Sequence, residues 1–268
     1  MNDPIPYGKH SITEEDIESV VEVLKSNYLT QGPTVAKFEN AFAEYIGSKY
    51  AIAVSNGTTA LHLCTSALNV QSNDRVITTP ITFAATGNCV RYQGGEVLFA
   101  DINSDTYLLD INSVREIIQK QSKTNPVTGI IPVDFAGKPV HMEAYRELAD
   151  EYGLWIIEDA CHAPGGTFND NQGGIQRCGN GKFADLAIFS FHPVKHIASG
   201  EGGMVTTNDE ILYNRILKLR SHGITKSQDH FIQSKSQSFG QPVENGSNDY
   251  PGWYMEMQQL GYNYRLTE

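Results

Sequence analysis

One pattern constrains the fold of this chain more than any other. Short apolar runs, most of which end in polar residues, recur along the sequence with amphipathic helical segments between many of them. These runs occupy residues 50–54, 75–79, 96–100, 128–133, 154–157, 185–190 and 203–207. Because they are apolar almost throughout, both faces of each strand must be covered, which is typical of parallel strands between layers of helices. The sequence therefore predicts an α/β fold with a mainly parallel sheet.

The segments outside these runs predict helices and two polar stretches. A first helix is capped by Thr13 and ends near Asn27, and a second ends at Gly47, which can cap its C-terminus. Further helices are expected over 112–121 and 142–152. Residues 165–181 are rich in Gly, Asn and Gln and predict an exposed excursion, and residues 225–252 predict an active-site loop or a linker.

Charge and composition exclude several classes of partner. The 268 residues carry 20 Lys and Arg against 31 Asp and Glu, a formal net charge of −11, which disfavours a broad nucleic-acid or anionic-membrane surface. No long apolar stretch predicts a membrane span, and the first residues do not resemble a signal peptide. The four cysteines form no C-x-x-C pair, so we expect reduced thiols and no metal. A cytoplasmic protein with small-molecule partners is the expectation.

Polar residues follow several of the predicted strands. They lie at 55–59, at Asp134, at 159–162 and at 190–195. Ligands of open α/β sheets bind at the carboxyl ends of the strands, so we expect these residues to share one crevice. The segment 55–59 opens a helix and offers N–H and hydroxyl groups to a phosphate, and the alternative is a simple helix cap, which is common for this composition.

Three side chains in this crevice suggest cofactor chemistry. Asp159 ends a buried run, where an ionised carboxylate needs a cation such as a protonated heterocycle nitrogen, unless it caps a following helix. His162 could bond Asp159, lie beside a ligand or be structural. Lys195 follows Pro193 in a turn; apolar surroundings can lower the pKa of such a lysine and free its amine for a Schiff base, whereas the alternative is a surface lysine.

Taken in order, the motifs resemble one enzyme family over essentially the whole chain. They are Ser-Asn-Gly-Thr-Thr-Ala-Leu at 55–61, Thr-Thr-Pro-Ile-Thr-Phe at 78–83, Glu-Asp-Ala-Cys-His-Ala at 158–163, Phe-Ser-Phe-His-Pro-Val-Lys at 189–195, Gly-Glu-Gly-Gly at 200–203, Arg-Ser-His-Gly at 220–223 and Gly-Tyr-Asn-Tyr-Arg-Leu at 261–266. This order resembles the DegT/StrS family of pyridoxal-phosphate (PLP)-dependent sugar aminotransferases. The segments 189–195 and 220–223, with Pro-Gly-Trp-Tyr at 251–254, most resemble its PseC-type members, which aminate a UDP-4-keto-6-deoxy-N-acetylhexosamine on the way to pseudaminic acid.

The resemblance implies a fold of the aspartate aminotransferase type. Residues 1–235 would form the PLP-binding large domain, and residues 236–268 a loop and the start of a helix leading to a C-terminal small domain that this chain lacks. It also implies a glutamate amino donor and a homodimer with shared active sites.

The resemblance further assigns a role to each candidate residue. Lys195 would hold the cofactor and shuttle a proton, and Asp159 would keep the pyridine nitrogen protonated. The other cofactor contacts would be Phe83 stacked on the ring, His162 beside the ring hydroxyl, Gly57, Thr58 and Ser190 on the phosphate, and Asn263 on the phosphate of the neighbouring subunit.

Three alternatives compete with this interpretation. A PLP-dependent sugar dehydratase of the same family would carry histidine in place of Lys195. A truncated, non-catalytic protein that binds PLP or a nucleotide sugar is a second possibility. A dinucleotide-dependent dehydrogenase is disfavoured because no G-x-G-x-x-G follows the first predicted strand.

Overall fold

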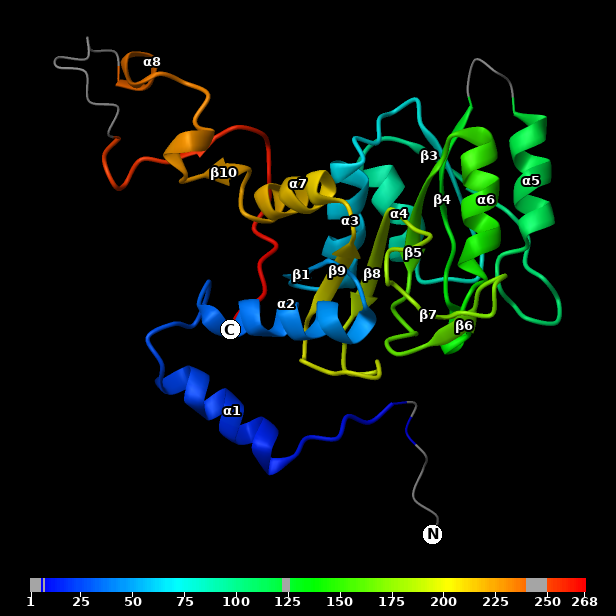
Figure 1. Cartoon of the computed structure of the whole chain (residues 1–268), viewed down its shortest axis with the longest axis horizontal. Helices are drawn as coiled ribbons and strands as arrows, with labels where there is room; N and C mark the ends of the chain where they lie inside the picture. Colours follow the sequence, from blue (N-terminus) through cyan, green and yellow to red (C-terminus); the bar gives the residue numbers. More distant parts are fainter. Residues whose placement is uncertain (1–5, 7, 122–125, 240–249) are drawn as a thin grey trace.

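A seven-stranded sheet forms the centre of the molecule. The computed structural model describes residues 6, 8–121, 126–239 and 250–268. The sheet has the order β1-β9-β8-β5-β4-β2-β3 (Figure 1). Its strands are β1 (Tyr50–Val54), β2 (Arg75–Thr78), β3 (Glu96–Phe99), β4 (Val127–Ile131), β5 (Trp155–Asp159), β8 (Leu186–Ser190) and β9 (Gly203–Thr207). Only β9 among them runs antiparallel to its neighbours, β1 and β8, so the predicted mainly parallel sheet is confirmed.

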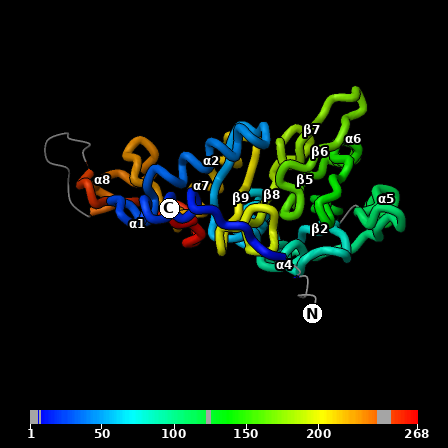
Figure 2. Tube along the Cα trace, turned by 90° about the horizontal axis from the view of Figure 1, so that it is seen from below, coloured from blue at the N-terminus to red at the C-terminus, as the bar shows by residue number. Residues whose placement is uncertain are grey.

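Helices cover both faces of this sheet. In the described part of the chain, the α-helices, not all of which contact the sheet, are α1 (Glu14–Lys25), α2 (Pro33–Ile46), α3 (Gly57–Ala67), α4 (Ala84–Tyr92), α5 (Ile111–Lys120), α6 (Met142–Tyr152), α7 (Glu210–Arg220) and α8 (Lys235–Phe239). Two short 3-10 turns are η1 (Phe135–Gly137) and η2 (Gln228–His230). The view along the sheet shows α2 and α6 on one side of the strands and α4 on the other (Figure 2). No helix of the described ranges is long and apolar enough to cross a bilayer.

Alternation along β1 shows why both layers are needed. Ile52 and Val54 pack into the cluster with α3 and α7, whereas Ala51 and Ala53 pack with Phe42 of α2. All of them are buried, as the apolar runs predicted. Burying a large aliphatic side chain contributes about 1.5–3 kcal/mol, so losing either helical layer would leave a whole face of the sheet unstable.

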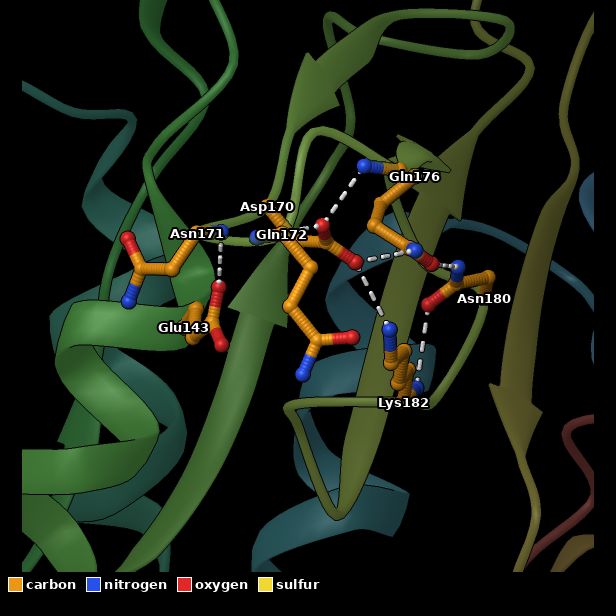
Figure 3. A network of polar contacts seen from close by, with 8 residues as sticks. Glu143, Asp170, Asn171, Gln172, Gln176, Asn180 and Lys182 are labelled. Atoms are coloured by element: carbon orange, nitrogen blue, oxygen red, sulfur yellow. Dashed lines mark hydrogen bonds and ion pairs between the residues drawn. The ribbon is translucent and has the colours of Figure 1, made fainter.

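Residues 165–181 form a hairpin, which the sequence did not predict. Its strands are β6 (Thr167–Asn169) and β7 (Ile175–Arg177). The buried carboxylate of Asp170 accepts hydrogen bonds from Gly174 N at 2.7 Å, Gln176 Nε2 at 2.7 Å and Lys182 Nζ at 2.8 Å (Figure 3). Most of this segment is exposed or half-buried, as expected of an excursion, but Asp170 and Cys178 lie inside.

The chain end is extended, and the expectation that it lies at the start of a helix is wrong. Arg265 and Thr267 form antiparallel bridges with Val54 and Thr30. Ser55 N also donates to Tyr264 O at 2.9 Å. Strand β1 is an edge of the sheet, and the chain end pairs with it at Val54, whereas Glu39 and Arg220 bind the backbone of Ala53.

The polar stretch 225–252 is described only in part. Residues 240–249 lie outside the described ranges, and the remainder includes β10 (Ile224–Thr225), which pairs with β11 (Glu256–Met257). The boundary expected between residues 235 and 236 stays a prediction. No disulfide forms among the four cysteines, all of which are described.

Candidate active site

The polar strand ends meet, as predicted, around the first turn of α3. A Cβ atom added to Gly57 would lie 3.1 Å from Ser190 Cβ and 3.4 Å from Cys161 Sγ. The turn after β1, the end of β8 and the turn after β5 therefore touch. Strand β9 begins between them, because a Cβ on Gly203 would lie 2.5 Å from the carbonyl carbon of Asn56. Only glycine fits at position 203, and a side chain at position 57 would require Ser190 to shift by a few tenths of an ångström.

The start of α3 combines a helix cap with a free anion-binding face. Asn56 Oδ1 accepts a 2.9 Å hydrogen bond from Thr59 N, and Asn56 N donates to Thr59 Oγ1 at 3.2 Å. The cap that competed with phosphate binding is thus present, and it occupies Asn56 and Thr59. The amides of Gly57 and Thr58 remain in the first turn, where the helix supplies no acceptor and its dipole favours an anion.

Asp159 is a buried carboxylate held in a fixed orientation. Its side chain is on the α3–α4 side of the sheet, and the residue is 4% exposed. Oδ2 accepts a 2.8 Å hydrogen bond from Thr86 Oγ1 of α4, and Oδ1 accepts one from Cys161 N at 3.3 Å. Turns follow β5 instead of a helix, so the helix-cap alternative is wrong. These two hydrogen bonds leave the carboxylate oxygens able to accept a further bond from a cationic partner.

Thr86 is a site residue that the sequence analysis missed. Its hydroxyl links Thr82, whose Oγ1 lies 2.8 Å away, to Asp159. The sequence carries no signal for it, because only the structure shows that this hydroxyl of the helix after Phe83 is fully buried. Such a hydroxyl needs a partner.

His162 and Lys195 lie close to this carboxylate. His162 Nδ1 accepts a 3.2 Å hydrogen bond from Ala136 N, not a bond to Asp159. Burial lowers the pKa of His162, and the nearby Lys195 charge lowers it further. Lys195 itself is half-buried in a turn closed by Lys195 N to His192 O at 2.8 Å. The neutral imidazole and the lysine amine therefore share one environment.

Phe83 and Asn263 connect to this group through their neighbours. Thr86, which binds Asp159, donates its N–H to Phe83 O at 3.1 Å, and Tyr264 O, next to Asn263, accepts from Ser55 N at 2.9 Å. Phe83 is 75% exposed at the start of α4 and lines a groove of about 470 Å³ beside that helix. The groove contains none of the other predicted site residues. Asn263 is exposed and pairs with Ser221 through the backbone. Neither position tests the role assigned to these two residues.

Two of the sequence motifs are structural. Arg220 of the Arg-Ser-His-Gly motif pairs with Glu39 at 2.6 Å and donates to Ala53 O at 2.8 Å, which ties α7 to α2 and β1. Gly223 and Gly261 cross at close range, since a Cβ on Gly261 would lie 2.1 Å from Gly223 N. These residues brace the segment that carries Asn263.

Comparison with known proteins assigns the chain to a family. The profile of the DegT/DnrJ/EryC1/StrS aminotransferase family matches residues 10–268. The chain belongs to this family. A family relative, the UDP-4-amino-4,6-dideoxy-N-acetyl-beta-L-altrosamine transaminase of Campylobacter jejuni, is 38% identical over 98% of this chain and 61% of its own length. The spore coat polysaccharide biosynthesis protein SpsC of Bacillus subtilis is 34% identical over the same shares.

A solved aminotransferase structure supports the fold. Helicobacter pylori PseC, an aminotransferase involved in the biosynthesis of pseudoaminic acid, superposes with a TM-score of 0.79 at 30% identity. The match covers 98% of this chain and 62% of that one. The aminotransferase fold predicted from the motifs is thereby confirmed. The chain spans 61% of the length of the two curated relatives described above.

Proposed function

We propose that this chain forms the cofactor-binding part of a PLP-dependent aminotransferase. The amino group would pass from glutamate to the 4-keto group of a UDP-linked 4-keto-6-deoxy-N-acetylhexosamine, in surface-polysaccharide or pseudaminic acid biosynthesis. The observation that carries the proposal is the buried, hydrogen-bonded Asp159 carboxylate within the same site as Lys195. Similarity to the Campylobacter transaminase and to PseC supports the sugar class.

The residues present fit PLP. Because Gly57 has no side chain, Ser190 approaches the first turn of α3 closely, so its hydroxyl would join the free amides of that turn around a phosphate. The donors there are neutral amides and hydroxyls, so an acidic protein can bind the dianion without a basic patch. Asp159 supplies the counter-charge for a protonated ring nitrogen, and exposed Phe83 offers an aromatic face to stack on the ring.

The chain's own residues then have distinct tasks. PLP, when bound, supplies an electron sink for the carbon that gains or loses the amino group. Asp159 would hold the proton on the ring nitrogen, and Thr86 keeps that carboxylate oriented. Lys195 would bind the cofactor and move a proton at its Nζ atom. Nδ1 of His162 accepts the Ala136 N–H, so the neutral imidazole carries its proton on Nε2, where it would be available to the cofactor.

A homodimer with shared sites and a cytoplasmic location are part of this proposal. A two-fold interface would let each Asn263 reach the partner's phosphate in the same way. The exposure of Asn263 is compatible with that role.

Product analysis tests the function. The full chain with PLP and glutamate should release 2-oxoglutarate, and mass spectrometry with a panel of UDP- and dTDP-linked 4-keto sugars should identify an amino sugar. A non-catalytic binding protein would take up PLP and release no 2-oxoglutarate. A dehydratase would yield a sugar that has lost water.

A further inference from the structure

Asp134 and Glu158 form a buried acidic pair that the proposed reaction does not use. Asp134 follows β4, and Glu158 precedes Asp159 in β5, so its side chain lies on the opposite face of the sheet. Carboxylate oxygens of the pair and Cys178 Sγ all lie within 4.8 Å of one another. Asp134 is 0% exposed and Glu158 is 3% exposed. Within the described ranges, neither carboxylate forms a salt bridge.

One oxygen of this pair lacks a hydrogen-bond donor. Asp134 Oδ1 accepts a 2.7 Å bond from Val140 N, and Glu158 accepts a 3.0 Å bond from Gly179 N. Asp134 Oδ2 is buried and has no partner in the described part of the chain. Two buried carboxylates at this range would also repel each other strongly. A proton between Asp134 Oδ2 and Glu158 removes both penalties, because it supplies the missing donor and cancels one charge.

We propose that Asp134 and Glu158 share one proton at neutral pH and that this shared proton positions Asp159. The sharing is independent of the proposed function, whereas the positioning rests on it. Burial raises the pKa of Asp134 to about 7, and burial together with the Asp134 charge raises the pKa of Glu158. Both raised pKa values agree with a proton that stays on the pair at neutral pH.

The backbone connects the pair to the site. Asp134 N donates to Asp159 O at 3.1 Å, and Asp159 N donates to Pro132 O at 2.9 Å. The turn after Asp134 carries Ala136, whose N–H holds His162. Through Gly179, Glu158 also anchors the excursion that contains β6 and β7. Loss of the proton would drive the ends of β4 and β5 apart and shift both Asp159 and His162.

The groups around the pair oppose a second negative charge. The negative charge of Asp159 raises the pKa of Asp134 from the other face of β5, Cys161 lies in the following turn and Cys178 at the end of the β6–β7 excursion. Burial raises the pKa of both thiols, so they remain neutral. Lys195 is a cation close to these groups, since its charge lowers the pKa of Cys161.

Infrared spectroscopy of the full chain tests the sharing. At neutral pH the wild-type protein should show the band of one buried protonated carboxyl group, and both Asp134→Asn and Glu158→Gln should lose it. An amide in either position donates the missing hydrogen bond and leaves its partner ionised. Absence of the band in the wild type, or its persistence in either variant, contradicts a single shared proton. One metal ion per chain by elemental analysis, lost in both variants, would assign a metal site instead.

Cofactor titration tests the positioning. PLP affinity at pH 7 should change less than about threefold in Asp134→Asn. It should fall at least about tenfold in Asp134→Ala, because Glu158 then has no side chain with which to share the proton. Equal affinity in both variants, with the infrared band present in the wild type, would leave the sharing intact and remove the positioning role. Failure of the wild type itself to bind PLP would reject the proposed function without affecting the infrared result.

Discussion

The hydroxyl of Thr86 donates a 2.8 Å hydrogen bond to Asp159 Oδ2, which joins α4 to the end of β5. Because the hydrogen bond joins two buried residues on different elements, the side chain is fixed before any cofactor binds. The carboxylate is therefore held in place at a position that water hardly reaches.

The variant Asp159→Asn tests that charge. The asparagine amide has nearly the same shape as the carboxylate but no charge, so PLP should still bind while amino transfer falls by orders of magnitude. The measurement is the single-turnover rate of 2-oxoglutarate release, with PLP absorbance as the control for loading. An unchanged rate would mean that Asp159 only stabilises the local turn.

Gly57→Ala tests whether the first turn of α3 binds the phosphate. The added methyl group would contact Ser190 and Cys161, so PLP affinity should fall more than about tenfold. Gly252→Ala is the matched control, since a Cβ there meets nothing within 4 Å. Equal affinities of the two variants in a fluorescence titration would show that no phosphate binds at Gly57.

Asp170→Asn tests the anchor of the β6–β7 hairpin. Lys182 and the backbone of Gly174 lower the pKa of Asp170 to about 2. A carboxyl with a lowered native pKa contributes stability above its unfolded pKa of about 4 and loses that contribution as the pH falls toward 2. The wild type should therefore exceed the variant in unfolding free energy at pH 5, and the gap should narrow at pH 3. A gap that is constant with pH would contradict this account.

The sheet and several site residues were predictable because each depends on local sequence. Continuous apolar runs fixed the strands, and Asp159 and Lys195 stood out at their ends. Thr86 and Glu158 did not stand out, because their roles come from contacts between distant elements. The reverse direction of β9 was equally hidden, since an apolar run looks the same in either direction. The extended segment around Arg265 depends on the unpaired edge of β1, which only the strand order reveals.

Subunit mixing tests the shared site. Asn263→Ala and Lys195→Ala should each be nearly inactive alone, and heterodimers formed from them should recover activity. If Asn263 serves the partner, each heterodimer combines both defects in one site and leaves the other intact. Demonstrated heterodimers without activity would leave Asn263 as a residue of its own subunit.

The most direct test of the central claim is borohydride reduction of the PLP-loaded protein followed by peptide mapping. The account predicts one cofactor per chain, attached irreversibly to the Nζ atom of Lys195 in the peptide that follows β8. Lys195→Arg should bind PLP without becoming labelled. An adduct on any other lysine, or wild-type protein that is loaded but not labelled, would contradict the account.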